Sequence, residues 1–114
     1  MEVRGDGTAW AGKGADERAA SASACDGFTD DGTMIAAASE AIWDNGGACG
    51  RVYSVTCTGA TNAGVSQPCR GGSVSVRIVD RCPPPYCRGT IDLSQEAFEI
   101  IADPDAGKIL ITYV

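Results

Sequence analysis

The chain has 114 residues, a formal net charge of −6 at pH 7 and no histidine. This length suits one ordinary domain, and the negative charge argues against nucleic acid and anionic membranes as partners, because contact with phosphates would be repulsive. The lack of histidine excludes Ser-His and Cys-His nucleophiles, so any catalysis would depend on carboxylates.

The N-terminal third predicts one strand, a loop and a second strand. Residues 5–10 indicate a short opening strand, and the small, polar residues 11–24 show no sustained period, which predicts a surface loop. Residues 33–38 are apolar and bounded by turn residues, as in a buried strand. Ser39 is then expected to cap a helical turn over residues 40–43, which ends at the turn residues that follow.

Two longer strands follow, over residues 51–58 and 73–80. Alternate residues share an inward face in each strand: Tyr53, Val55 and Cys57 in the first, and Val74, Val76 and Ile78 in the second. The residues 58–64 between them predict a loop. Consecutive prolines in the stretch 80–87 predict a rigid turn, since proline lacks a backbone donor.

The C-terminal part predicts a strand, a helix and a last strand. Residues 91–94 end a short strand, and Ser94 is expected to cap a helix over residues 95–102 whose inward residues are Ala97, Ile100 and Ile101. Residues 108–114 alternate, with Ile109, Ile111 and Tyr113 inward. About six strands in so short a chain predict an all-β fold, and a closed barrel leaves fewer exposed edges than a sandwich.

Six cysteines occur, at positions 25, 49, 57, 69, 82 and 87. Zinc sites use Cys pairs two to four residues apart with further His or Cys pairs, and this spacing is missing. The even number and the small domain favour disulfides, so we expect an oxidising compartment and neither metal nor cofactor. Residues 1–6 lack the apolar centre of a signal peptide, and no apolar run approaches the ~20 residues of a membrane span. We therefore expect a mature secreted chain behind an added Met1, without membrane insertion.

Four motifs stand out: Gly-Thr-Met-Ile-Ala-Ala-Ala-Ser at 32–39, Trp-Asp-Asn-Gly at 43–46 leading to Ala-Cys-Gly at 48–50, Ile-Val-Asp-Arg-Cys-Pro-Pro at 78–84, and Gly-Thr-Ile-Asp-Leu-Ser-Gln-Glu-Ala-Phe at 89–98. Together they resemble plant natriuretic peptides, which are secreted, expansin-like proteins related to barwin. The resemblance spans residues 25–114, and residues 11–24 depart from it. It implies a single domain over residues 1–114, a six-stranded double-psi β-barrel with short helices, and a monomer of the apoplast. It also implies three disulfides, Cys25–Cys49, Cys57–Cys69 and Cys82–Cys87.

The resemblance further implies candidate acids. Asp92 matches the proton donor of barwin-like endoglucanases, and Asp80 resembles an aspartate of lytic transglycosylases; each follows a strand, so both can point into one groove. Hydrolysis ordinarily needs a second carboxylate, which the endoglucanases carry where this chain has Gly12. We therefore predict no enzyme and no catalytic residue, with Asp92 and Asp80 as vestigial acids and lytic cleavage as a minor alternative. Asp16 or Glu17 would replace the missing acid only if the loop folds back.

Structural roles compete with these assignments. Asp92 can accept backbone N–H groups at the start of the helix, and Asp80 can pair with Arg77 or Arg81. Trp10, Tyr53 and Tyr86 are candidates for a sugar-stacking surface beside the two acids. Tyr53 and Trp43 also suit the core.

Three functions remain open. The first is non-enzymatic signalling in ion and water homeostasis through a cell-surface receptor, for which the resemblance implies the receptor-binding candidates Phe28, Asp30, Asp31, Trp43, Asp44 and Arg51. The second is a cell-wall polysaccharide-binding or loosening module that uses the groove. The third is a defence protein such as a protease inhibitor, with the proline turn 83–86 inserted into the protease.

Overall fold

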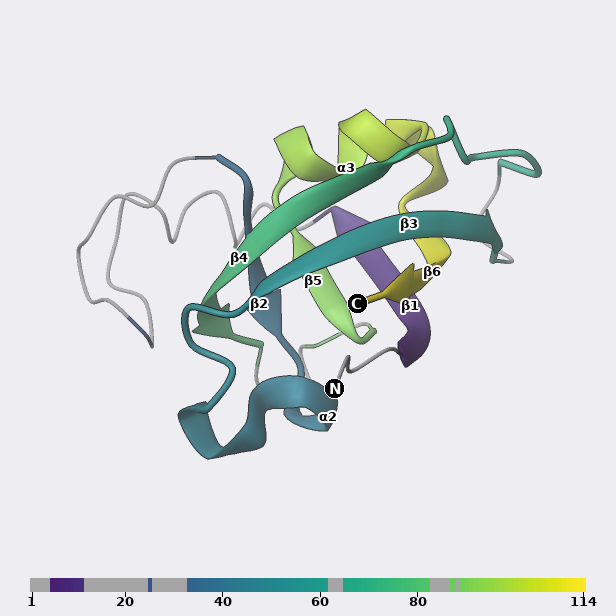
Figure 1. Cartoon of the computed structure of the whole chain (residues 1–114). Helices are drawn as coiled ribbons and strands as arrows, with labels where there is room; N and C mark the ends of the chain where they lie inside the picture. Colours follow the sequence, from purple (N-terminus) through teal and green to yellow (C-terminus); the bar gives the residue numbers. More distant parts are fainter. Residues whose placement is uncertain (1–4, 12–24, 26–32, 62–64, 83–86, 88) are drawn as a thin grey trace.

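Strands dominate the computed structural model, which describes residues 5–11, 25, 33–61, 65–82, 87 and 89–114 (Figure 1). The expected loop 11–24 lies outside the described residues from residue 12 onward, as does the proline turn 83–86. No helix among the described residues is long and apolar enough to span a bilayer.

Six strands form a closed barrel in the order β1-β5-β2-β4-β3-β6. Their bounds are β1 Gly5–Ala11, β2 Ile35–Ala38, β3 Val52–Ala60, β4 Ser73–Arg81, β5 Ile91–Leu93 and β6 Lys108–Tyr113. The pairs β1/β5 and β2/β4 are parallel, and β6 closes the ring by pairing antiparallel with both β1 and β3. The six-stranded barrel predicted from the sequence is confirmed.

The core follows the predicted alternation of side chains along the strands. Tyr53 and Val55 of β3, the inward residues of β4, and Ile109, Ile111 and Tyr113 of β6 are all buried in one cluster, and Cys57 packs against it while partly exposed. The prediction that β3 ends at residue 58 is wrong. Gly59 and Ala60 pair with β6 beyond a bulge after Cys57. Pairing with β6 therefore makes β3 longer than the side-chain pattern of β3 predicts.

The α-helices are α2 Glu40–Trp43 and α3 Gln95–Ile101, which lie on opposite sides of the barrel (Figure 1). Short 3-10 turns follow them at η1 Asp44–Gly46 and η2 Pro104–Ala106. Ser94 caps α3 as predicted, since its side chain accepts the N–H of Ala97. Ser39 precedes α2 but makes no capping hydrogen bond, and its buried hydroxyl has no partner among the described residues.

The inward face of α3 differs from the prediction at one position. Ile100 is 51% exposed, whereas Phe98 is fully buried together with Ala97 and Ile101. Positions 97, 98 and 101 lie on one face of a helix, and position 100 lies beside that face. The bulk of Phe98 therefore fills the space over the barrel that the sequence analysis assigned to Ile100.

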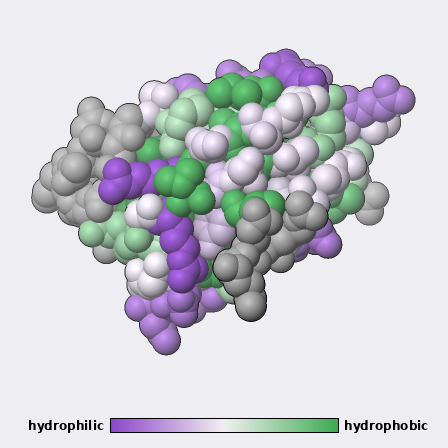
Figure 2. Space-filling view, viewed as in Figure 1, coloured by the Kyte–Doolittle hydropathy of each residue, from purple (hydrophilic) through white to green (hydrophobic). Residues whose placement is uncertain are grey.

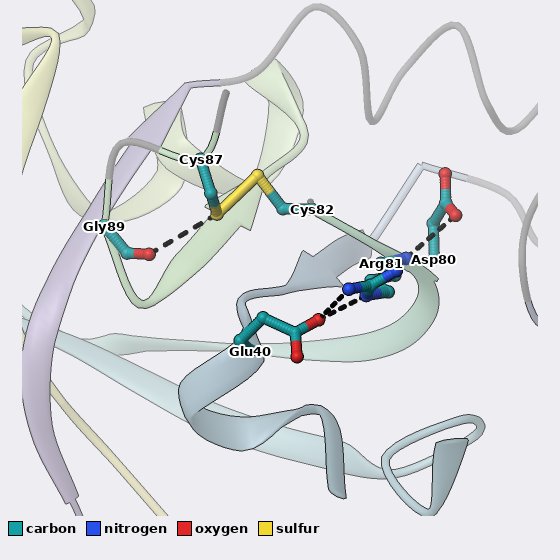
Figure 3. Close-up of a disulfide and its surroundings, with 6 residues drawn as sticks. All are labelled: Glu40, Asp80, Arg81, Cys82, Cys87 and Gly89. Atoms are coloured by element: carbon teal, nitrogen blue, oxygen red, sulfur yellow. Dashed lines mark hydrogen bonds and ion pairs between the residues drawn. A yellow bond between two sulfur atoms is a disulfide. The ribbon is translucent and has the colours of Figure 1, made fainter. Parts of the chain in front are cut away.

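All six cysteines form disulfides, and the pairing implied by the resemblance is confirmed. Cys25 joins Cys49 after η1, and Cys57 of β3 joins Cys69, which forms an isolated bridge with Ala102 beyond α3. Cys82 directly follows β4 and joins Cys87 (Figure 3). The three links close successive, non-overlapping stretches of chain.

Candidate functional site

Four residues from adjacent strands form a row across β1, β5, β2 and β4. Trp10 pairs with Asp92, Asp92 pairs with Ala37, and Ala37 pairs with Asp80. Directly paired residues of a sheet project from the same side. Their immediate neighbours in β1, β5 and β2, among them Ala9, Ile91 and Ala38, lie inside the barrel in the main core cluster. In β4, a bulge in the pairing with β2 places Asp80 opposite Ala37, out of step with the core residue Ile78 two positions earlier. The row of Trp10, Asp92, Ala37 and Asp80 therefore lies on the outer face, and we call it the acidic row.

The two carboxylates of the acidic row are close in space and largely covered. Asp92 and Asp80 lie two strand spacings apart, so their Cα atoms are about 10 Å apart. Asp92 is 4% exposed and Asp80 is 7% exposed, and Ala37 between them is fully buried. The structure thus brings the two candidate acids together on one face, although they come from separate strands and the sequence places them twelve residues apart.

Asp80 is fixed by the chain itself. Its Oδ1 accepts the backbone N–H of Arg81 at 2.8 Å. The Arg81 guanidinium forms an ion pair with Glu40, the first residue of α2. Figure 3 shows the Arg81 side chain directed toward Glu40 and the Asp80 carboxylate directed away from it. The expected charge pair of Asp80 with Arg81 is therefore wrong: the Arg81 side chain pairs with Glu40, and Asp80 contacts Arg81 through its main-chain N–H.

A small apolar cluster borders the acidic row. Trp10, Ala37 and Cys82 are buried together, and Cys87 packs against them while partly exposed. The Cys82–Cys87 disulfide thus holds the end of β4 against the indole of Trp10. Trp10 is only 7% exposed, so it forms part of the floor of this face and does not present a free ring.

Tyr53 does not belong to this face, which corrects its assignment to the groove. It is buried in the main core, and its strand β3 pairs with β4 and β6 and not with β1, β5 or β2. The alternative assignment of Tyr53 to the core is correct. Tyr86 lies outside the described residues.

Part of the predicted receptor-binding set lies at α2 and η1. Trp43 is partly buried against the main core, whereas Asp44 and Arg51 are exposed and joined by an ion pair of 2.6 Å. Hydrogen bonds with Tyr53 and Asp44 raise the pKa of Arg51 further above its ordinary value. The surface over α2 and η1 is hydrophilic, at the lower edge of the view in Figure 2. Phe28, Asp30 and Asp31 lie outside the described residues.

A pocket of about 380 Å³ lies beside α2, which sequence reasoning did not predict. It is lined by Glu40, Ala41, Ile42, Asp44, Arg51, Tyr53 and Tyr113. The rings of Tyr53 and Tyr113 meet edge to face with centroids 5.4 Å apart. Burial, with Tyr53 and Asp6 nearby, raises the pKa of Tyr113. The only sequence signal for this pocket is a tyrosine at the end of the last strand, where an alternating pattern predicts core.

Known proteins resemble this chain in both sequence and fold. A family model described as lytic transglycolase matches residues 35–113. An EG45-like domain containing protein of Citrus jambhiri is 64% identical over 91 residues, which cover 80% of this chain and 69% of that protein. The putative EG45-like domain containing protein 1 of Arabidopsis thaliana is 55% identical over 85 residues, covering 75% and 68%. Expansin-B4 of Arabidopsis thaliana is 32% identical over 90 residues, covering 70% of this chain and 32% of its own length.

Solved expansin structures share the fold. The apo expansin of Clavibacter michiganensis superposes with a TM-score of 0.68 and 26% identity, covering 98% of this chain and 50% of the expansin. A mutant of the same expansin in complex with cellohexaose superposes with the same TM-score and 27% identity, with the same coverage. The chain thus spans half the length of these solved expansins. This likeness confirms the predicted double-psi β-barrel.

Proposed function

The chain belongs to the expansin-like family of double-psi β-barrels, and on that premise we propose that it acts outside the cell by binding cell-wall polysaccharide without hydrolysing it. The three disulfides support an oxidising, extracellular compartment. The acidic row carries the proposal, because it gathers two carboxylates and an indole on one outer face of the barrel.

The chemistry of the acidic row suits a neutral sugar chain. Carboxylates accept hydrogen bonds from sugar hydroxyls, and hydrogen bonds to a charged group are stronger than neutral ones. The row crosses four adjacent strands, so its groups lie along a line, as contact with an extended polymer requires. The related expansin that was solved with cellohexaose supports a β-glucan as the first ligand to test.

The same geometry supports binding over hydrolysis. An inverting glycosidase needs room between its two carboxyl groups for a water molecule and the sugar. Here Ala37 occupies the strand position between Asp92 and Asp80. Asp80 is also bonded to the main chain of Arg81, which favours a structural role for this acid. Asp92 is then the residue that we propose contacts the sugar.

Retention on insoluble polymers tests this proposal. The protein is incubated with cellulose, chitin and peptidoglycan, and the bound fraction is measured together with any soluble sugar released. We expect retention on at least one polymer without release, and Asp92→Asn should weaken it about tenfold, as for a lost hydrogen bond to a charged group. Glu99→Gln, an exposed change on α3, is the matched control and should bind as the parent does. No retention on any polymer would refute binding, and release of sugar would refute the absence of turnover.

A second candidate is signalling through a cell-surface receptor, which the exposed Asp44–Arg51 ion pair favours. It presents a charged, hydrophilic surface at α2 and η1 (Figure 2). The test is the volume of plant protoplasts exposed to the whole protein, to a synthetic peptide of residues 25–53, and to the variant Asp44→Asn. A volume change that is reduced in the variant supports the candidate, and no response to either the protein or the peptide refutes it.

A further inference from the structure

The pocket beside α2 has more hydrogen-bond acceptors than donors. Its polar groups are the carboxylates of Glu40 and Asp44, the hydroxyls of Tyr53 and Tyr113, and the guanidinium of Arg51. A carboxylate has about four lone-pair sites, and a tyrosine hydroxyl also accepts. The Arg51 guanidinium already donates a hydrogen bond to the Asp44 carboxylate at 2.6 Å and a second one to the Tyr53 hydroxyl at 3.5 Å. Much of the acceptor capacity of the pocket is therefore open to a ligand that donates.

The charges around the pocket favour a cation. Arg51 is balanced by Asp44, and Glu40 is balanced by Arg81, which reaches it from β4. Asp6, on the strand beside β6, lies close enough to contribute to the raised pKa of Tyr113. The surroundings thus carry a net negative charge, as the whole chain does with −6. A fixed field of this sign draws in cations and repels anions.

Tyr113 supplies a second polar group that a ligand in the pocket can bond. Its side chain lines the pocket, is only 9% exposed, and makes no hydrogen bond with its hydroxyl to any described residue. The ring lies against Gly5, where an added Cβ would come within 2.3 Å of it, so its position is fixed by packing. A ligand that bonds this hydroxyl would take the place of solvent there. The tyrosine rings also attract a cation through their π faces.

We propose that this pocket receives the cationic side chain of a lysine or arginine from a partner protein. A volume of about 380 Å³ is at the small end of ligand pockets, and a long, unbranched side chain can reach the tyrosines while its main chain stays at the rim. The exposed Asp44–Arg51 pair lies at that rim, where a protein surface would contact it. This site is independent of polysaccharide binding, since it shares no residue with the acidic row.

The test is an NMR titration of the isotope-labelled protein with arginine amide. We expect shifts at the amides of Asp44, Tyr53 and Tyr113 that weaken as salt is added. Citrulline amide keeps the α-amino group and the shape of the side chain but lacks the guanidinium charge, and it should give no shifts. Glucosamine is the second probe, because tighter binding of this amino sugar would overturn the assignment to a protein partner.

Two variants with opposite expected effects separate binding from loss of structure. Asp44→Asn leaves the charge of Arg51 uncompensated and should weaken the binding of arginine amide about fivefold, as for one exposed ion pair. Arg51→Gln removes the competing cation and should strengthen the binding of arginine amide by a similar factor. Glu99→Gln and Asp92→Asn should leave the affinity unchanged, so failure here is distinct from failure on polysaccharide. Equal binding of citrulline amide, no pocket shifts, or weakening in Arg51→Gln would each refute the proposal.

Discussion

Removing the disulfides one at a time should destabilise the barrel in the order of the chain lengths that they close. The pairs are Cys25–Cys49, Cys57–Cys69 and Cys82–Cys87, with separations of 24, 12 and 5 residues. Because these stretches do not overlap, each link restricts the unfolded chain separately. The loop-entropy relation then gives losses of about 3.4, 2.8 and 2.1 kcal/mol at 25 °C when both cysteines of a pair become alanine.

Packing modifies the smallest of these values. Cys82 is buried against Trp10, so its replacement also removes apolar contacts, and the loss for the Cys82–Cys87 pair should approach that of the middle pair. The loss for Cys25–Cys49 should stay the largest. Urea unfolding followed by circular dichroism gives the free energy for each variant, and the slope with urea shows whether the unfolded state has changed. The loop-entropy account would be wrong if Cys25–Cys49 proved the least important link.

Three further perturbations test the local structure by the free energy of unfolding. Ser94→Ala should lower the free energy of unfolding by about 1–2 kcal/mol, because the cap of α3 is lost. Ser39→Ala should change the free energy of unfolding by less than about 0.5 kcal/mol or raise it, because its hydroxyl is buried without a partner. Equal losses in the two variants would contradict this. Ile101→Ala should lower the free energy of unfolding by about 2–5 kcal/mol and Ile100→Ala by less than about 1 kcal/mol, and the reverse order would show that the orientation of α3 is wrong. Burial raises the pKa of Tyr113 above its ordinary 10.0, so the unfolded chain loses this proton first and stability should fall as the pH rises above 10.0. Tyr113→Phe should remove that part of the alkaline dependence, and an unchanged pH profile would contradict it.

Strands with one buried face could be predicted from the sequence because their side chains alternate. The regular alternation in β4 and β6 gave both the strands and the inward residues, since a strand half exposed to water repeats every two residues. Ser94 could be predicted as a cap because its hydroxyl needs only the N–H of Ala97, three residues along the same chain. Such features depend on local geometry alone.

The wrong predictions concern features that depend on contacts with residues far away in the sequence. Ser39 has the sequence of a helix cap, yet α2 is a single turn whose start is fixed by the barrel, as the backbone bond from Ser39 to Thr90 shows. Ile100 and Phe98 are both apolar, and only the surface beneath α3 determines which of them is buried. The extension of β3 through Ala60 likewise depends on the pairing with β6.

The candidate site was predicted in part, because its residues come from motifs but its arrangement comes from topology. Asp92 and Asp80 each follow recognisable patterns, and the sequence does not say that β5 and β4 flank β2 on either side. That order places Ala37 between the two acids. The same order removes Tyr53 from the face and places it beside Tyr113, which made a sugar-stacking role for Tyr53 wrong.

The two proposed sites should act independently although they meet at the end of β4. Successive residues there diverge: Asp80 belongs to the acidic row, whereas Arg81 reaches Glu40 at the pocket beside α2. Both partners of this ion pair are about half exposed, with side-chain exposures of 41% and 50%. Exposed ion pairs contribute about 1 kcal/mol or less, so a ligand that breaks this one in the pocket can shift binding at the row by no more than about fivefold. A rigid barrel, whose backbone is fixed on each side of Arg81 by strand pairing, offers little other means of coupling them.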